Sequence, residues 1–287
     1  MSTRRLQRLI PGQQVSDGAG VRLNRTLGQS AFTRLDPFLM LDEFSSFDAD
    51  DYLAGFPSHP HRGFETVTYM LDGHMLHEDH LGNRGDLTPG AVQWMTAGRG
   101  IIHSEMPQQH AGRMRGFQLW INLPAKEKMT PARYRDIAPE QVPCFQFAPG
   151  VQVKLIAGRL MIPGGDEYAG PINGDSEPRS TDPFYADVQL DANTEATLPV
   201  KAGHAAFLYV FEGTLTLDGQ QVPTHSAAVL SDGQRVTVHS GHDGARFLLL
   251  AGRPLKEPVV QYGPFVMNSS EEIEQALRDY RQGVLTD

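Results

Sequence analysis

Hydrophobic and polar residues alternate over short stretches through most of the chain, from about residue 22 to residue 252. Clear examples are Glu65–Leu71, Gly116–Leu123 and Ala205–Phe211. Turn-forming dipeptides such as Asp72-Gly73 and Asp218-Gly219 separate these stretches at short intervals. A period of two predicts strands with one buried face, and many short strands joined by tight turns predict a β-sandwich or β-barrel. We therefore expect an all-β protein.

Two parts of the sequence resemble each other and indicate an internal duplication. The segment Thr68–Gly73 matches Leu208–Gly213 at an offset of 140 residues, and Ile102-His103-Ser104 matches Val238-His239-Ser240 at an offset of 136. A chance match of six residues is the competing interpretation. Duplication predicts two β-domains, which 287 residues are long enough to form.

Three segments outside the strand pattern suggest the boundaries. Residues Met129–Pro143 are rich in proline and charge and are interpreted as a linker, and Pro163–Pro183 as a long surface loop. In the tail, Ser269 and Glu272 have the spacing of a capping box and Gly283 follows as a stop, which predicts a helix over Glu271–Arg281. We expect an N-terminal domain over residues 1–135, and a C-terminal domain over residues 136–287 that ends in this helix.

Composition excludes several classes of protein. A formal net charge of −9 at pH 7 argues against direct binding of nucleic acid or of an anionic membrane by bulk electrostatics. One cysteine, Cys144, permits no internal disulfide, and no segment has the pattern of a signal peptide or a membrane span. The sequence predicts a cytoplasmic protein, with a monomer as the expected state.

Candidate chemistry is concentrated in one region, because six of the eleven histidines fall between residues 59 and 103. His59 and His61 stand two positions apart, which in a strand directs both imidazoles to the same face. His103 and Glu105 form a second pair of this kind. Two such pairs on facing strands would bring four ligands to one point, and this donor set suits iron, nickel, copper, cobalt, manganese or zinc. The alternative is that these are exposed or hydrogen-bonded imidazoles without an ion.

Other polar residues of this region are harder to assign from spacing. Glu65 shares parity with His59 and His61, so it could be a ligand or an acceptor that orients a ligand imidazole. His74, His77 and His80 have no uniform parity and are interpreted as solvated surface.

The second half of the chain offers no comparable set of ligands. Slid by these offsets, the counterparts of the two pairs are Pro199, Lys201, His239 and Gly241. The second domain is therefore expected to be structural. We interpret His204 as an isolated surface or hydrogen-bonded residue.

Four sequence blocks resemble the pirin family of the cupin superfamily. They are His59–Val67 (HPHRGFETV), Gln93–Pro107 (QWMTAGRGIIHSEMP), Gln118–Pro124 (QLWINLP) and Gly263–Asn268 (GPFVMN). The resemblance implies a bicupin, with two antiparallel β-barrels of the jelly-roll type face to face. It also implies one mononuclear metal, most often Fe(II), in the first barrel. By the family pattern the metal ligands are His59, His61, His103 and Glu105, whereas Glu65 lies behind them.

The resemblance implies two functional classes. Some bacterial pirins show quercetin 2,3-dioxygenase activity, and some eukaryotic pirins are described as nuclear cofactors of transcription regulators. We therefore expect a dioxygenase that uses O2 on a flavonol or a related enolic compound, with Glu105 as the catalytic proton acceptor. The alternative is a metal-dependent regulatory module that binds a protein partner without catalysis. A third possibility is a structural bicupin whose metal only stiffens the barrel.

Overall fold

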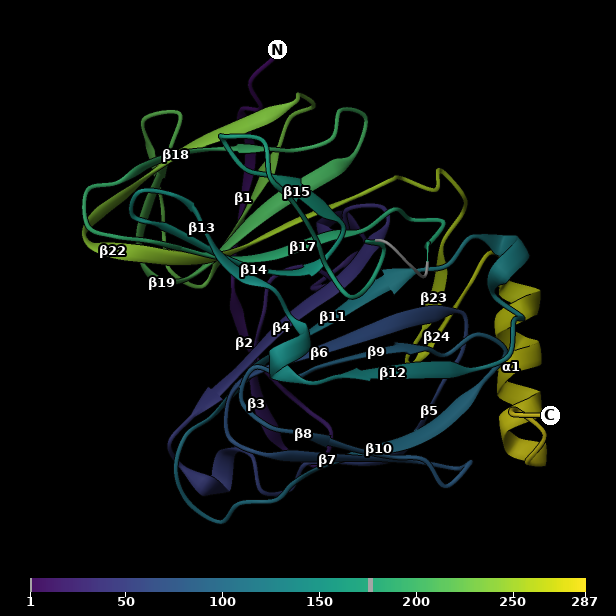
Figure 1. Cartoon of the computed structure of the whole chain (residues 1–287). Coiled ribbons are helices and arrows are strands. Elements are labelled where there is room, and N and C mark those ends of the chain that lie inside the picture. Colours follow the sequence, from purple (N-terminus) through teal and green to yellow (C-terminus); the bar gives the residue numbers. More distant parts are fainter. Residues whose placement is uncertain (1, 175–177) are drawn as a thin grey trace. The chain divides into compact units, whose positions relative to one another are not determined.

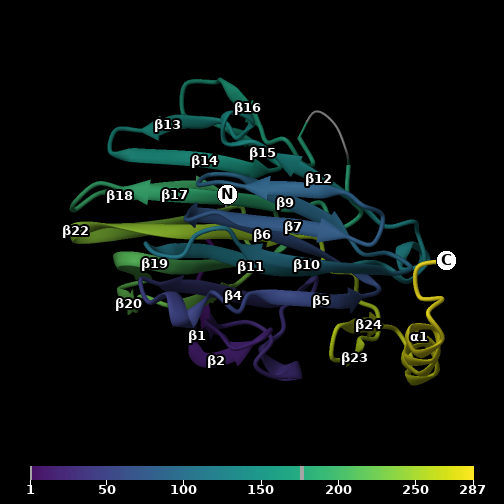
Figure 2. The ribbon, with the colours of Figure 1, turned by 90° about the horizontal axis from the view of Figure 1, so that it is seen from below.

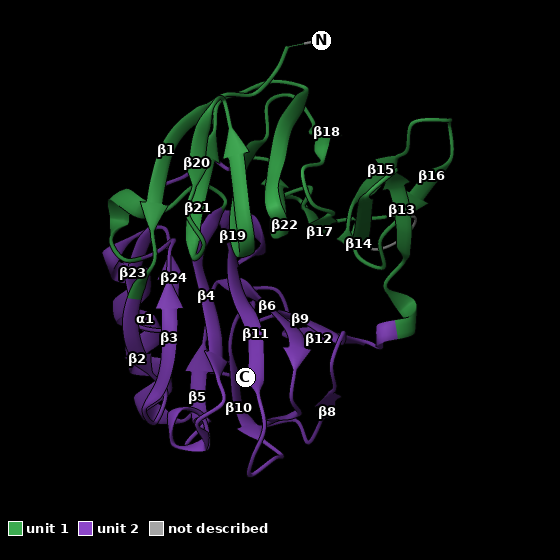
Figure 3. Cartoon of the chain, turned by 90° about the vertical axis from the view of Figure 1, so that its left-hand side faces the viewer, with its two compact units in different colours: residues 1–13, 29–37, 140–254 green, residues 14–28, 38–139, 255–287 purple. Residues whose placement is uncertain are grey.

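The computed structural model describes residues 2–174 and 178–287. The chain divides into two compact units, each built from three separate segments (Figure 3). Unit 1 holds residues 1–13, 29–37 and 140–254, and unit 2 holds residues 14–28, 38–139 and 255–287. Strands dominate both units and the described part contains one α-helix near the C-terminus, which confirms the expected all-β class. No helix in that part is long and apolar enough to cross a bilayer.

Unit 2 contains two antiparallel sheets that lie as two layers (Figure 1). The larger sheet has the strand order β12-β9-β6-β11-β4-β3-β2, and the smaller has the order β5-β10-β7-β8. The bounds are β2 Gln13–Asp17, β3 Val21–Arg25, β4 Phe38–Ser46, β5 Phe56–His61, β6 Phe64–Asp72, β7 Met75–Asp79, β8 Arg84–Leu87, β9 Val92–Thr96, β10 Ile101–Pro107, β11 Met114–Asn122 and β12 Arg133–Ile137.

Unit 1 is built on one large antiparallel sheet with the order β1-β21-β19-β22-β17-β14-β13, and Figure 2 shows β14, β17, β22 and β19 side by side. Strand β18 pairs with β22, β20 pairs with β19, and β15 with β16 forms a separate hairpin. The bounds are β1 Leu6–Pro11, β13 Cys144–Ala148, β14 Val151–Ala157, β15 Arg159–Met161, β16 Glu167–Ala169, β17 Phe184–Leu190, β18 Glu195–Pro199, β19 Ala205–Leu217, β20 Gln220–Val222, β21 Ser226–Leu230 and β22 Arg235–Gly252.

The strand pattern of the sequence corresponds to burial in the structure. In β14, Val151, Val153 and Leu155 are buried while Gln152 between them is exposed, as a strand with one face on the core requires. Together with residues of β17, β19 and β22 they form the hydrophobic core of unit 1. Four short 3-10 helices join strands, at Ala31–Thr33, Ala49–Asp51, Ala125–Glu127 and Pro139–Gln141.

The C-terminal helix α1 spans Ser270–Gln282 and begins and ends where the sequence predicted. The Ser269 side chain accepts a hydrogen bond from the backbone of Glu272, and the Glu272 side chain accepts one from the backbone of Ser269. Gly283 ends the helix with φ of 74°, a conformation that favours glycine. The helix buries Ile273 and Ala276 against the hairpin of β23 (Val260–Tyr262) and β24 (Phe265–Met267).

The units differ from the predicted domains 1–135 and 136–287 at both ends of the chain. Strand β1 belongs to unit 1 because it pairs with β21, and helix α1 belongs to unit 2 because it packs on β24. The predicted linker is also wrong, because β12 lies within Met129–Pro143 and pairs with β9.

The predicted surface loop Pro163–Pro183 contains one short strand, β16. Residues 175–177 of that loop lie outside the described part of the chain.

Candidate metal centre

The two predicted pairs of ligands lie on neighbouring antiparallel strands of unit 2. His59 on β5 stands directly opposite His103 on β10, and His61 stands opposite Ile101. Residues paired across an antiparallel ladder point to the same face of the sheet. A bulge between His103 and Glu105 shifts the register, so that Glu105 stands opposite Phe56. The imidazoles of both strands therefore share one face of the smaller sheet.

Three imidazoles converge on this face. One ring nitrogen each from His59, His61 and His103 lies within 4.8 Å of the others. The Nε2 atoms of His59 and His61 are 3.0 Å apart, and Nδ1 of His59 donates to the carbonyl of Pro57 at 2.8 Å. That hydrogen bond places the proton of His59 on Nδ1, so its Nε2 lone pair faces the other rings.

Burial keeps these rings neutral. His61 and His103 are 3% and 2% exposed. Burial lowers the pKa of each well below its ordinary range, and the neighbouring histidines lower the pKa further. Neutral imidazoles present lone pairs to a cation, and the buried Nε2 of His103 has no hydrogen-bond partner.

The separation of the nitrogen atoms also fits a metal ion. Two nitrogens that bind one ion at about 2.1 Å and at right angles are about 3.0 Å apart. This is the separation of Nε2 in His59 from Nε2 in His61. The three histidines thus fit a transition-metal ion by donor type, protonation and spacing.

Glu105 lies beside the three imidazoles but outside the group whose ligand atoms lie within 4.8 Å of one another. Its side chain is 3% exposed, and its Oε1 accepts a hydrogen bond from the Thr68 hydroxyl at 3.0 Å. The Gln118 amide lies 3.2 Å from Oε2. Thr68 and Gln118 are cross-strand neighbours on β6 and β11, so the larger sheet holds the carboxylate that the smaller sheet supplies.

His77 is not solvated surface, contrary to the interpretation of the sequence. It is fully buried on β7, directly opposite Glu105, and its Nδ1 lies 3.4 Å from Nδ1 of His103. Burial lowers its pKa. His74 and His80 of the same hairpin are partly or fully exposed, so grouping the three obscured the signal. The parity of His77 within its own strand carried that signal.

Glu65 faces another partner than the imidazoles. Its side chain is 1% exposed and accepts a hydrogen bond from the Thr96 hydroxyl at 2.7 Å. Both residues lie on the larger sheet, where β6 pairs with β9.

A cavity of about 560 Å³ opens over the imidazoles. His59, His61 and Glu105 line it together with Gln118 and an ion pair between Arg25 and Asp42. Its apolar walls come from strands β3, β4, β5, β7 and β11, with side chains Leu23, Leu39, Met40, Phe44, Phe56, Met75 and Trp120. This volume and this mostly apolar wall with a few polar groups are typical of sites for small molecules.

Two buried cations fix the backbone that carries His61, and the sequence patterns did not reveal either. Arg62 donates to Asp279 at 2.6 Å and to the Leu285 carbonyl at 2.9 Å. Lys128 donates to the Gly63 carbonyl at 2.7 Å. A Cβ atom at Gly63, where φ is 92°, would overlap the Val266 carbonyl oxygen, so only glycine permits this close approach. The C-terminal segment thereby supports the strand of the metal centre.

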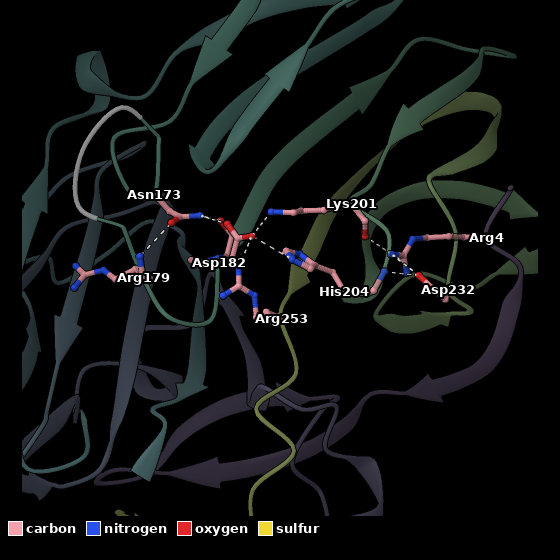
Figure 4. A network of polar contacts seen from close by, with 10 residues as sticks. Arg4, Asn173, Arg179, Asp182, Lys201, His204, Asp232 and Arg253 are labelled. Atoms are coloured by element: carbon pink, nitrogen blue, oxygen red, sulfur yellow. Dashed lines mark hydrogen bonds and ion pairs between the residues drawn. The ribbon is translucent and has the colours of Figure 1, made fainter. Parts of the chain in front are cut away.

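Unit 1 contains a polar network around Asp182 (Figure 4). Oδ2 of Asp182 lies 2.5 Å from the Lys201 ammonium, 3.2 Å from Nε2 of His204 and 3.4 Å from Arg253. His204 is thus a buried residue beside a carboxylate rather than a surface residue. His239, the counterpart of His103, is half exposed and lies 3.5 Å from a carboxylate oxygen of Glu195.

Comparison with protein families gives two matches. Residues 20–121 match the model described as Pirin, and residues 185–286 match the model described as Pirin C-terminal cupin domain. A Pseudomonas aeruginosa protein provisionally named as a quercetin 2,3-dioxygenase is 59% identical over 280 residues, which cover 96% of each chain. Human Pirin is 39% identical over 286 residues, which cover 98% of this chain and 93% of Pirin.

Solved structures show the same fold. The quercetin 2,3-dioxygenase of Acinetobacter baumannii has a TM-score of 0.87 at 32% identity and covers 99% of both chains. A bacterial pirin of Escherichia coli, solved in complex with nickel(II), has a TM-score of 0.61 at 19% identity and covers 86% of this chain and 98% of that one. At that identity, the second match supports the fold alone.

Proposed function

The chain belongs to the pirin family, and on this premise we propose that unit 2 holds a mononuclear iron(II) centre for quercetin 2,3-dioxygenase-type oxygenation of a flavonol or a related enolic compound. One observation carries the proposal. Three neutral, buried imidazoles and a carboxylate lie at the base of an apolar cavity of about 560 Å³.

His59, His61 and His103 would hold the ion through Nε2, and Glu105 is the proposed fourth ligand. When bound, the metal would acidify the hydroxyl group of the substrate and provide the site at which O2 reacts. The names of the two relatives assigned to quercetin 2,3-dioxygenase support this class of substrate.

Glu105 is also the proposed proton acceptor. Thr68 donates to Oε1, while Oε2 has only the longer contact with the Gln118 amide, so Oε2 is the atom that can take the hydroxyl proton. Gln118 lines the cavity and orients the carboxylate from the opposite sheet.

The cavity walls perform two further tasks. Leu39, Phe44 and Trp120 offer apolar surface on which the rings of a flavonol can pack. The same side chains exclude water from the space above the imidazoles, which strengthens the electrostatic interactions between the carboxylate and the bound substrate.

Aerobic turnover of quercetin by iron-loaded protein tests the proposal. We expect turnover by the wild-type protein and its loss in His61→Ala. His239→Ala, which removes a half-exposed imidazole of unit 1, is the matched control and should retain turnover. An absence of turnover with iron, copper, nickel, cobalt and manganese alike would contradict the dioxygenase proposal for this substrate.

The alternative function, a metal-dependent module that binds a regulatory protein, is separated by the same preparation. The 39% identity to human Pirin over nearly the whole chain keeps this possibility open. A pull-down that recovers a protein partner with metal-loaded protein but not with stripped protein would favour it, particularly where quercetin is not consumed.

A further inference from the structure

His77 is a buried imidazole for which the dioxygenase chemistry gives no role. It is fully buried on β7, one strand away from His103. Gly85 stands opposite His77 on β8 and adds no side chain on that side. A histidine in this position must place two ring nitrogens in the interior of unit 2, and an unpaired buried polar atom is unfavourable.

The contact between His77 and His103 provides one partner for each ring. Their Nδ1 atoms are 3.4 Å apart and their ring centroids are 4.7 Å apart. A neutral imidazole carries one proton, so one Nδ1 atom of the pair donates and the other accepts. The geometry alone leaves two arrangements, which differ in the nitrogen of His103 that remains free.

The metal centre selects between these two arrangements. Nε2 of His103 is buried without a hydrogen-bond partner, so it is the atom available to an ion. A nitrogen that binds a metal carries no proton, and the proton of His103 must therefore sit on Nδ1. Nδ1 of His77 then accepts, and its own proton sits on Nε2.

We propose that His77 is a positioning residue that accepts a hydrogen bond from Nδ1 of His103 and so directs Nε2 of His103 toward the metal. Metal-bound histidines commonly donate their second ring N–H to a carboxylate or a carbonyl group, and here a neutral imidazole would take that place. The inference rests on the proposed metal centre, but it requires no particular substrate.

Both rings are held in place by the sheets of unit 2. His77 packs on Tyr134 of β12, with ring centroids 5.4 Å apart. His103 packs on His59 and His61 at 4.3 and 4.8 Å. His77 thus connects the cluster to the far edge of the larger sheet, and a change at this position should alter the orientation of the His103 ring.

The first test reads the tautomers directly, without metal or substrate. Long-range proton–nitrogen NMR spectra of the wild-type protein, labelled with 15N in its histidine rings, should show a proton on Nδ1 of His103 and on Nε2 of His77. The spectra of His77→Asn and His77→Leu would assign the signals. The reverse arrangement, with the proton of the pair on Nδ1 of His77, would overturn the proposal.

The second test measures affinity for Co²⁺, whose visible absorption bands report the coordination geometry. In His77→Asn the amide oxygen can stand near the position of Nδ1 and accept the same hydrogen bond, whereas His77→Leu has a similar shape and no acceptor. We expect His77→Leu to bind Co²⁺ about 10- to 100-fold more weakly than the wild type with altered bands, and His77→Asn to recover most of the affinity. His74→Leu, in the same hairpin but bonded to Asp86, is the matched control and should bind as the wild type does.

The outcomes separate the two proposals. Wild-type protein that binds no Co²⁺ would remove the metal centre itself. Wild-type binding that persists unchanged in a folded His77→Leu would remove the role of His77 and leave the metal centre intact. Should His77→Leu fail to fold, the tautomers of the wild-type protein still decide the proposal.

Discussion

Lys128 is a single buried charge that joins three segments of unit 2. Its side chain is 1% exposed, and its ammonium donates to the Gly63 carbonyl, the Asn122 side chain and the Val266 carbonyl at 2.7, 2.6 and 2.9 Å. Burial lowers its pKa to about 8, although Glu257 and Glu272 favour the charge. The three acceptors match the three protons of an ammonium group, which explains how the interior tolerates it.

Replacing Lys128 with methionine tests this residue. The variant keeps the length of the side chain but leaves three buried acceptors without a donor, each at a cost of about 1–3 kcal/mol, and the loss of the buried charge offsets part of that cost. We expect the free energy of unfolding to fall by about 3 kcal/mol, measured by urea denaturation at pH 7.

Lys126→Met is the matched control for this measurement. The Lys126 side chain is 77% exposed, and its carboxylate neighbour Glu127 is 3.9 Å away. An exposed pair of this kind contributes little, so the control should change the stability by less than about 0.5 kcal/mol. Equal effects of the two substitutions would show that burial of Lys128 has no energetic consequence.

His204 makes the stability of unit 1 depend on pH. Burial lowers its pKa, nearby Lys201, Arg253 and Arg4 lower it further, and Asp182 opposes them. In the unfolded chain the imidazole has a pKa of about 6.5. As the pH falls below that value, the unfolded chain takes up a proton that the folded chain resists. The free energy of unfolding must therefore decrease.

His204→Gln removes this source of pH dependence. Comparing the free energy of unfolding at pH 7.5 and pH 5.5 should show a smaller loss of stability in the variant than in the wild type. His242→Gln, which removes an imidazole that is 85% exposed, is the control. If His204→Gln loses as much stability on acidification as the wild type, the buried imidazole is not the source of the effect.

Residue spacing predicts which side chains share a face, but not which are buried. The spacing of His59 and His61 and of His103 and Glu105 was sufficient to bring them to one face of one sheet. Spacing along the chain could not show that β7 pairs with β10, which is the long-range contact that places His77 beside His103. Pairing between strands is set by the whole fold, so this neighbour became visible only in the structure.

At the scale of elements, the predictions failed where composition and tertiary pairing disagree. The segment around Arg133 and Arg135 has the charge and proline content of a linker, yet it forms β12 at the edge of the larger sheet. Charged side chains are typical of edge strands, because they discourage further pairing. Composition therefore indicated exposure correctly and assigned the wrong element.

Helix α1 was predictable because its signals are local. The capping residues Ser269 and Glu272 and the terminating Gly283 all lie within one turn of its ends. The unit in which the helix packs depends instead on contacts with β24, more than two hundred residues from the start of the chain. Local patterns gave the helix, and only distant contacts gave its place.

At the scale of the whole molecule, sequence order does not determine membership of a unit. The expected domains were two continuous halves, but unit 2 includes the last 33 residues, Leu255–Asp287. This segment supplies Asp279 and the Leu285 carbonyl to Arg62, and the Val266 carbonyl to Lys128. A part of the chain that follows unit 1 in sequence thus supports the metal centre of unit 2.

Ending the chain at Pro254 tests this assignment. The truncation removes five buried apolar side chains, Phe265, Val266, Met267, Ile273 and Leu285. Each contributes about 1.5–3 kcal/mol when fully buried, so their loss is comparable with the entire stability of a typical domain. We expect amide hydrogen exchange to become much faster in β5, β6 and β10, and Co²⁺ binding to be lost.

The distribution of the faster exchange distinguishes the two ways of dividing the chain. Under the division seen in the structure, protection in residues 56–72 should fall more than in residues 205–230, because the tail packs with the former. Under continuous halves, the larger loss would fall in residues 205–230. Removal of Thr286 and Asp287 alone is the control, since it leaves Leu285 and its hydrogen bond to Arg62 in place. Because the same tail residues hold the backbone next to His61, the loss of protection in β5 and the loss of metal binding should occur together.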